Sequence, residues 1–279
     1  MAQARGDRAQ RWLVGGPPSA FLVVFFLVPA LIMVIASFRY PGEFGGLAPF
    51  LGAAPGEEAG LTTENYRVFF GERIYFEIFL KSFGVAALTT LVCLAMAYPL
   101  ALLIARSPKR HRDLMVLLCV LPFASNFLVR VYAWMIMLGP FDLLFSKFAV
   151  LAAMVYVHLP FMILPLYTNL EKHDPTLLDA AQDLGANGWQ RFWRVTFPLS
   201  LPGVFAGSAL VFIPVLGMFA IPEILGGIGD WLVGNMIKES FLGVRDWPFG
   251  SMLALMLTGC VLVIAGAAAW LARGTVARA

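Results

Sequence analysis

The chain has 279 residues, of which 60% are hydrophobic and 13% are charged, and its formal net charge at pH 7 is +3. This composition excludes an ordinary soluble domain and indicates a membrane protein, whose length is best divided into spans. The small net charge gives no support to nucleic-acid binding. Three cysteines lie inside apolar runs without the spacing of metal ligands, so we expect packed thiols at Cys93, Cys119 and Cys260.

The N-terminal part begins with a basic segment, residues 1–18, followed by an apolar run at 19–38. Basic residues before an apolar run are also typical of a secretory signal. The run is long enough to cross a bilayer core of about 30 Å, however, and no clear small-x-small cleavage site follows it, so we expect a retained first helix. Residues 39–74 are rich in Gly, Pro and Glu and predict an external loop with a short helix near residues 63–70.

Five more apolar runs predict transmembrane helices. They lie at residues 75–105, 114–138, 148–169, 199–225 and 249–271. The connecting segments are a basic turn at 106–113, an external turn at 139–147, a polar segment at 170–198, an external loop at 226–248 and a tail at 272–279. Lys and Arg are concentrated at both ends of the chain, in the basic turn and in the polar segment, so the positive-inside rule places the termini in the cytoplasm. The predicted fold is an all-α polytopic membrane protein with six transmembrane helices.

The polar segment, residues 170–198, has the signals of two short helices separated by a glycine turn. Asp174 is a suitable N-cap, and Pro175 occupies the first helical position, where its missing N–H costs nothing. Gly185 and the pair Asn187-Gly188 supply the left-handed conformations that end one helix and redirect the chain. We therefore expect a surface-lying helical elbow on the cytoplasmic side.

This segment resembles the EAA loop of ABC-importer permeases, which reads Glu-Ala-Ala, then Gly, then Ile-x-Leu-Pro at the same spacings. The matching residues here are Asp179-Ala180-Ala181, Gly185, Val195 and Phe197-Pro198, and the departures are Asp179 for Glu, Val195 for Ile and Phe197 for Leu. In that family the loop is the coupling helix that docks in a cleft of the ATPase subunit; the alternative is an amphipathic surface loop without a partner. The resemblance implies a set of ATPase-coupling residues: Asp179, Ala180, Ala181, Asp183, Leu184, Gly185, Ala186 and Pro198.

Four more strings resemble the first permease subunit of spermidine/putrescine importers. They lie at residues 127–134, 159–167, 221–227 and 245–250. The resemblance implies a type I ABC-importer permease of the bacterial inner membrane, which moves a polyamine by alternating access. It also implies a pair of ATPase subunits that bind ATP and Mg, a paralogous second permease subunit and a periplasmic solute-binding protein, with no cofactor bound by this chain. An importer of the same class for another small solute is the alternative.

The sequence gives no sign of a catalytic centre. It contains no Gly-x4-Gly-Lys-Ser/Thr loop for nucleotide phosphates, no Gly-x-Ser-x-Gly elbow and no His-Glu-x-x-His helix. Its three histidines, His111, His158 and His173, are scattered. We therefore expect a transporter without a metal site, while a membrane enzyme using His158 with Glu223 and a passive channel remain as weaker alternatives.

Polar and aromatic residues inside the predicted spans are candidates for the solute path, because ionisable groups in a bilayer tend to face cavities or partners. Glu223, beside Pro222, is a carboxylate that would neutralise one ammonium of a diamine; otherwise it lies at the outer interface or pairs with Arg130. Arg130 is expected to have a structural role. The remaining solute-path candidates are aromatic groups for cation–π contact and one amide: Tyr132, Trp134, Tyr156 and Asn126.

Overall fold

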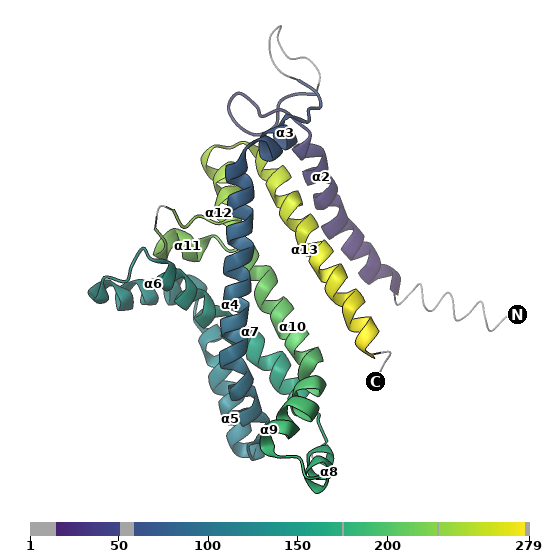
Figure 1. The fold of residues 1–279 in the computed structure, drawn as a ribbon. Helices are drawn as coiled ribbons and strands as arrows, with labels where there is room; N and C mark the ends of the chain where they lie inside the picture. Colours follow the sequence, from purple (N-terminus) through teal and green to yellow (C-terminus); the bar gives the residue numbers. More distant parts are fainter. Residues whose placement is uncertain (1–14, 51–58, 175, 228, 277–279) are drawn as a thin grey trace, which may run out of the picture. The chain divides into compact units, whose positions relative to one another are not determined.

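The computed structural model describes residues 15–50, 59–174, 176–227 and 229–276, with the backbone alone for 267–276. In these parts the chain is helical, and its extended pairing is limited to two isolated bridges, Arg39 with Leu61 and Pro41 with Leu47. The chain forms two compact units, Met1–Phe76 with Met236–Ala279 and Glu77–Asn235 (Figure 1). The basic segment at residues 1–14 and the end of the tail lie outside the described residues.

The first unit is built on two long helices and the loop after the first of them. A π-helical turn, η1 (Val23–Leu27), leads into α2 (Val28–Ser37), which packs along α13 (Trp247–Val276). The predicted short helix of the loop is confirmed as α3 (Glu64–Gly71). Its Asn65 side chain donates to the carbonyl oxygens of Ser37 and Arg39, at 2.9 and 3.1 Å, and so fixes the loop to the end of α2.

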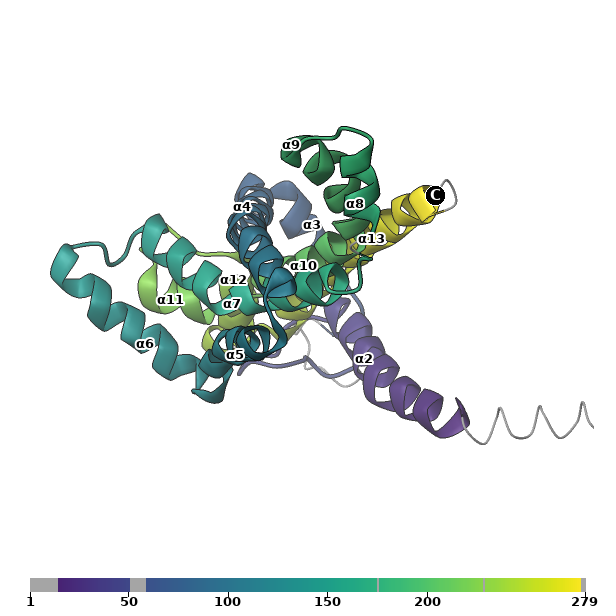
Figure 2. The ribbon, with the colours of Figure 1, turned by 90° about the horizontal axis from the view of Figure 1, so that it is seen from below.

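The second unit contains most of the remaining elements. The long helices of this unit run side by side, and α8 and α9 lie at one end of them (Figure 1), as the view from below also shows (Figure 2). The elements are α4 (Arg73–Arg106, which begins in the first unit), α5 (Lys109–Val120), η2 (Leu121–Ala124), α6 (Phe127–Leu138), η3 (Gly139–Phe141), α7 (Lys147–Leu170), α8 (Thr176–Asp183), α9 (Gly188–Arg191), η4 (Phe192–Thr196), α10 (Phe197–Leu216) and α11 (Ala220–Leu225); α12 (Val233–Lys238) and η5 (Glu239–Gly243) lead back to the first unit.

In the second unit, α7 packs closely against α10. A Cβ atom built on Gly207 of α10 would lie 2.7 Å from the Sδ atom of Met162 and 3.2 Å from its carbonyl oxygen, so a larger residue would push the helices apart. Small residues are the usual means by which transmembrane helices approach closely, because lipid tails offer no hydrophobic drive for association.

Five described helices are long and apolar enough to cross a membrane, and a sixth span results if one bent pair is counted as a unit. The five lie at Gly15–Ser37, Arg73–Arg106, Lys147–Leu170, Gly188–Leu216 and Trp247–Gly266. They agree with the predicted all-α polytopic fold.

The predicted third span, residues 114–138, is not one straight helix. Lys109–Ala124 and Phe127–Phe141 meet at an angle of 92°. Pro122 lies in a 3-10 turn, and Ser125 is extended. Asn126 is extended too, and its side-chain oxygen accepts from the N–H of Leu128 at 2.8 Å, so it caps a new helix instead of continuing the old one. This solute-path candidate is thus used as an N-cap.

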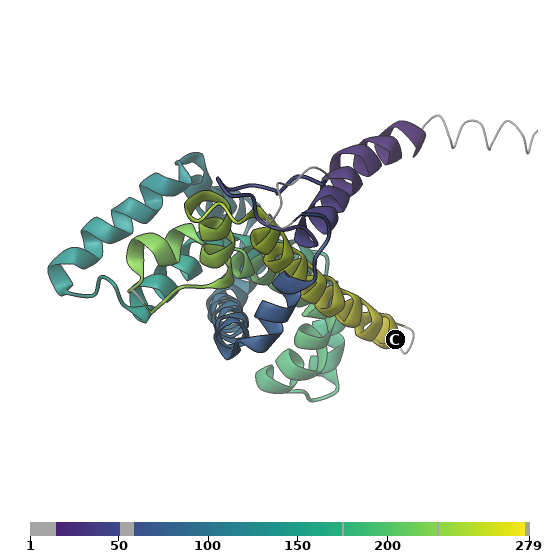
Figure 3. The same cartoon turned by 90° about the horizontal axis from the view of Figure 1, so that it is seen from above.

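The predicted fifth span, residues 199–225, is also interrupted. Helix α10 ends at Leu216, three residues leave the helical path, and α11 starts at Ala220. Glu223 therefore lies in a separate short helix, which packs beside α6 (Figure 3).

Candidate functional site

The polar segment begins with the predicted N-cap. The Asp174 carboxylate accepts a hydrogen bond from the N–H of Thr176 at 2.9 Å. This bond, with a further one from the Thr176 side chain, holds the pKa of Asp174 below its usual range. Pro175 lies outside the described residues.

The turn between α8 and α9 has the predicted left-handed glycine. Gly185 has a φ of +80°, and its N–H donates to the carbonyl oxygen of Gln182 at 2.8 Å. The N–H of Ala186 then donates to the carbonyl of Ala181 at 3.0 Å. A capping box starts α9: the Asn187 side chain accepts from the N–H of Gln190 at 2.9 Å, and the Gln190 side chain accepts from the N–H of Asn187 at 3.0 Å. The prediction of two short helices joined by a turn at Gly185 is confirmed, but the left-handed conformation predicted for Asn187-Gly188 is wrong, because Asn187 is extended at a φ of −73° and acts as the N-cap of α9.

Side-chain contacts hold the segment in one shape and fix it to the membrane helices. Arg191 donates to the Gln182 side chain at 2.6 Å and thereby ties α9 to α8. Glu171, where the segment leaves α7, forms an ion pair with Arg112 of α5 at 2.8 Å. The first contact therefore connects α8 to α9, and the second connects the start of the segment to α5.

An aromatic cluster fixes α9 and η4 to α4. The Phe192 ring makes an edge-to-face contact with Tyr98 of α4, with 5.5 Å between the ring centroids, and a similar contact with Trp193 at 5.2 Å. The Tyr98 hydroxyl is hydrogen-bonded to Ser200 of α10 at 2.7 Å. Because α9, η4 and α10 form one continuous helix from residue 188 to residue 216, the second half of the elbow is continuous with the membrane helix.

Small and apolar residues are exposed on the outward face of α8 and directly after it. Leu184 has 89% of its surface exposed. The opposite side of α8 faces a hollow of about 320 Å³, which Leu177 and Leu178 line together with residues of α4, α7 and η4. Of the predicted coupling residues, most are exposed and two are half-buried; the exposed ones are Asp179, Ala180, Asp183, Leu184, Gly185 and Pro198, and the half-buried ones are Ala181 and Ala186.

The structure brings some of the solute-path candidates together and separates others. Trp134 and Tyr156 make an edge-to-face contact at 5.7 Å and line a cavity of about 400 Å³. Arg130 lines the same cavity. Tyr132 is 48% exposed and does not line that cavity, and Glu223 is exposed on α11.

The enzyme alternative required His158 to act with Glu223. His158 is 2% exposed, and its Nδ1 atom is hydrogen-bonded to the carbonyl oxygen of Met154 at 2.8 Å, while Glu223 lies on the exposed side of α11. In the described residues no group of three His, Cys, Asp or Glu side chains is placed to hold a metal.

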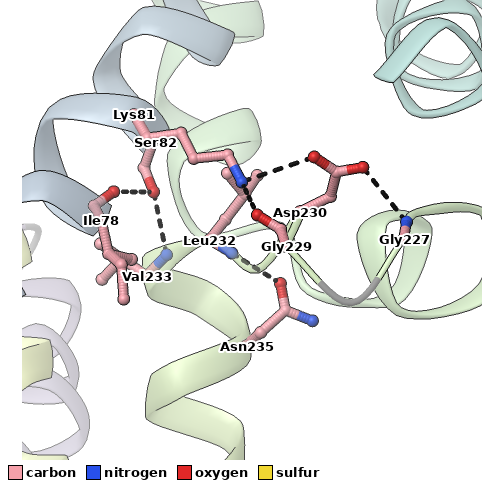
Figure 4. A network of polar contacts seen from close by, with 9 residues as sticks. All are labelled: Ile78, Lys81, Ser82, Gly227, Gly229, Asp230, Leu232, Val233 and Asn235. Carbon is pink, nitrogen blue, oxygen red and sulfur yellow. Dashed lines mark hydrogen bonds and ion pairs between the residues drawn. The ribbon is translucent and has the colours of Figure 1, made fainter. Parts of the chain in front are cut away.

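A polar network that the sequence analysis missed fixes the segment after α11 to α4 (Figure 4). Lys81 of α4 forms an ion pair with Asp230 at 3.6 Å and donates to the carbonyl oxygen of Gly229. Next to it, the Ser82 hydroxyl accepts from the N–H of Val233 at 2.9 Å. The partners lie about 150 positions apart in the sequence, so local patterns contain no signal for their pairing beyond two polar residues inside an apolar run.

We expect the variant Ser82→Ala to lower the thermal stability of the detergent-purified protein. The change leaves the buried N–H of Val233 without an acceptor, at a cost of about 1–3 kcal/mol. The control is Ser107→Ala directly after α4, where the exposed hydroxyl donates to the carbonyl of Leu103 in the last turn of the helix. Equal unfolding midpoints for the two variants would show that the Ser82 bond contributes no stability.

Comparisons with known proteins agree with this geometry. Residues 97–276 match the family described as binding-protein-dependent transport system inner membrane component. The chain is 38% identical over 258 residues to the spermidine/putrescine transport system permease protein PotB of Haemophilus influenzae, with 86% of each chain covered.

Two solved structures have the same fold. One is a chain of a bacterial ABC transporter involved in the import of the acidic polysaccharide alginate, with a TM-score of 0.70, 16% identity and coverage of 97% of this chain and 98% of that one. The other is a chain of the alginate transporter in complex with its alginate pentasaccharide-bound periplasmic protein, with a TM-score of 0.67, 15% identity and 94% coverage of both chains. The predicted resemblance to importer permeases is confirmed. The chain belongs to the family of binding-protein-dependent transport system inner membrane components, and it is a transporter permease subunit of the inner membrane, not an enzyme.

Proposed function

We propose that the protein is the permease subunit of an ATP-driven importer for polyamines such as putrescine and spermidine. The observation that carries the substrate class is the 38% identity, over 86% of both chains, to a spermidine/putrescine permease subunit. In this proposal a periplasmic binding protein delivers the solute, and a paralogous second permease subunit completes the path. ATP and Mg are bound by a pair of ATPase subunits.

The polar segment is the proposed contact with the ATPase, on the cytoplasmic side together with both termini. Its exposed residues, with Leu184 at 89% exposure, are available to a partner, while Arg112, Glu171 and the Tyr98 cluster connect its inner side to α4, α5 and α7. Closure of the ATPases would then push α8, and the unbroken helix from residue 188 to residue 216 would move with it. Such a rigid movement opens the solute path toward one side of the membrane and closes it toward the other.

Glu223 is the proposed solute contact. Its carboxylate is on the exposed side of α11 and would accept a charge-assisted hydrogen bond from a solute ammonium. Trp134 and Tyr156 are poorer candidates than the sequence suggested, because the guanidinium of Arg130 lines their cavity and repels a second cation. Tyr132 is exposed on α6 and does not line this cavity, so this argument does not apply to it.

The test is ATP-driven uptake of labelled putrescine by the assembled transporter in proteoliposomes. We expect Glu223→Gln to lower uptake at subsaturating solute by about tenfold, because a hydrogen bond to a charged group is worth about 1.5–3 kcal/mol. The control is Glu64→Gln, which removes an exposed carboxylate of α3. Unchanged uptake by the Glu223 variant would reject its role as a cation contact.

Competition in the same vesicles tests the substrate class separately. Unlabelled putrescine and spermidine should compete, whereas neutral and anionic solutes should not. If a neutral solute competes and polyamines do not, the protein is still an importer permease but its substrate is not a polyamine. Uptake without ATP would favour the passive channel.

A further inference from the structure

Helix α6 lies across the second unit instead of along it. Lys109–Ala124 is a helical stretch of 16 residues, or about 24 Å at 1.5 Å per residue, which is most of a bilayer core of about 30 Å. The chain then turns by 92° into α6. If the first stretch crosses the membrane, α6 runs near the membrane plane at the far end from the polar segment (Figure 1).

The surface of α6 has the composition of an interfacial helix. Val131 and Leu138 are buried against the rest of the unit, while Val129, Ile136 and Tyr132 are 62%, 73% and 48% exposed. Aromatic side chains with one polar end are enriched at the level of the lipid headgroups, and helices with an exposed apolar face lie at that level.

The one cation of α6 lies in a cavity without an acidic group. In the part of the chain that the structure describes, Arg130 is the only charged residue that lines this cavity of about 400 Å³, beside Trp134 and Tyr156. Among the described residues, the Arg130 Nε–H is buried without a hydrogen-bond partner. Its guanidinium carbon lies 5.6 Å from the centre of the Phe123 ring.

A guanidinium in a cavity whose lining has no acidic residue is chemically suited to an anion with several oxygen atoms. Arg binds phosphate through parallel hydrogen bonds, and it is less strongly hydrated than Lys, which favours this contact at the edge of an apolar phase. The remaining lining residues are mostly apolar or aromatic, with Val129 and Met137 continuing onto the exposed surface. If the phosphate of a phospholipid is bound here, the acyl chains of that lipid lie beside this exposed apolar surface.

We propose that the Arg130 cavity binds the phosphate of a membrane phospholipid and that α6 is thereby held at the headgroup level. The charge excludes a polyamine from this cavity, so the lipid site is separate from the proposed solute contact at Glu223. The inference does not depend on the identity of the transported solute.

The experiment uses the assembled transporter in nanodiscs of phosphatidylethanolamine and phosphatidylglycerol that contain a phosphatidylglycerol with a photoreactive headgroup. After illumination, mass spectrometry measures labelling of the peptide that contains α6. We expect Arg130→Gln to reduce this labelling by about tenfold, because a charge-assisted contact is lost, and Arg130→Lys to cause a smaller reduction, because it keeps the charge without the planar fork.

The matched control is Lys109→Gln at the opposite end of α5, which should leave labelling of the α6 peptide unchanged. Recovery of the Arg130→Gln protein as an assembled, membrane-inserted transporter ensures that lost labelling is not lost folding. Three results would overturn the proposal. The first is equal labelling with and without Arg130. The second is displacement of the label by excess inorganic phosphate, which indicates a site for free anions, and the third is labelling that appears only when the second permease subunit is absent, which indicates that this surface is a protein contact.

Discussion

Replacing Gly185 with valine is expected to reduce ATP-driven uptake by at least about tenfold while the protein still inserts in the membrane. Gly185 has a φ of +80°, a conformation that costs an L-residue about 1–2 kcal/mol and is worst for a β-branched one. A Cβ atom at Gly185 would meet nothing within 4 Å, so the effect comes from the backbone alone. The strain is relieved by rotating α8 relative to α9, which moves the exposed coupling residues away from their partner.

Gly188 provides the matched control for this experiment. It is also free of neighbours within 4 Å of a Cβ atom, but its φ is not positive. Gly188→Val should therefore retain uptake, and a bulky or charged residue at Ala181 should behave like Gly185→Val. If the two glycine variants transport equally well, the left-handed turn has no part in coupling.

The variant Leu184→Asp should prevent stable association with the ATPase subunits. Leu184 is 89% exposed, so the change does not disturb the fold, but in the proposed complex it is covered. Burial of a leucine contributes about 1.5–3 kcal/mol, and an unpaired carboxylate in its place adds a desolvation cost, so the dissociation constant should rise about a hundredfold. The measurement is the amount of ATPase that copurifies with the permease, together with solute-stimulated ATP hydrolysis.

Leu61→Asp is the control for this second variant. Leu61 is 67% exposed in the loop between α2 and α3, away from the polar segment in sequence and in the other compact unit. The Leu61→Asp variant should copurify with the ATPase to the same extent as the unaltered protein. Normal copurification of the Leu184 variant would place the ATPase contact elsewhere.

Long apolar runs predicted most of the helices correctly, because length and hydrophobicity alone decide whether a segment can cross a bilayer. Prolines were less informative. Pro99 and Pro160 lie inside uninterrupted helices, whereas Pro122 lies at a break. The difference at Pro122 is the following Asn126, whose side chain caps a new helix. The local sequence shows that Pro122 and Asn126 are present, but it does not show whether the helix continues past the proline or a new helix starts at the asparagine.

The candidate site was predictable to a different extent in its two parts. The elbow follows from Asp174, Gly185 and Asn187, which act through local hydrogen bonds that short-range sequence reasoning can anticipate. The contact of Lys81 with Asp230 joins α4 to the segment after α11, and the cavity beside Arg130 is completed by Tyr156 of α7. Their positions depend on how the helices pack, which one sequence does not reveal.

The wide turn η4 sets the angular register between the elbow and the membrane. A π-helical turn accommodates one residue more than a regular turn, and each residue of an α-helix corresponds to about 100° of rotation. The phase of α10 relative to α9 therefore depends on this single extra residue. Deleting one residue between Phe192 and Thr196 would turn the Gly207 face of α10 away from Met162, or else twist the aromatic cluster off Tyr98. The number of residues in this stretch thus fixes the rotational position of the whole membrane helix relative to the elbow.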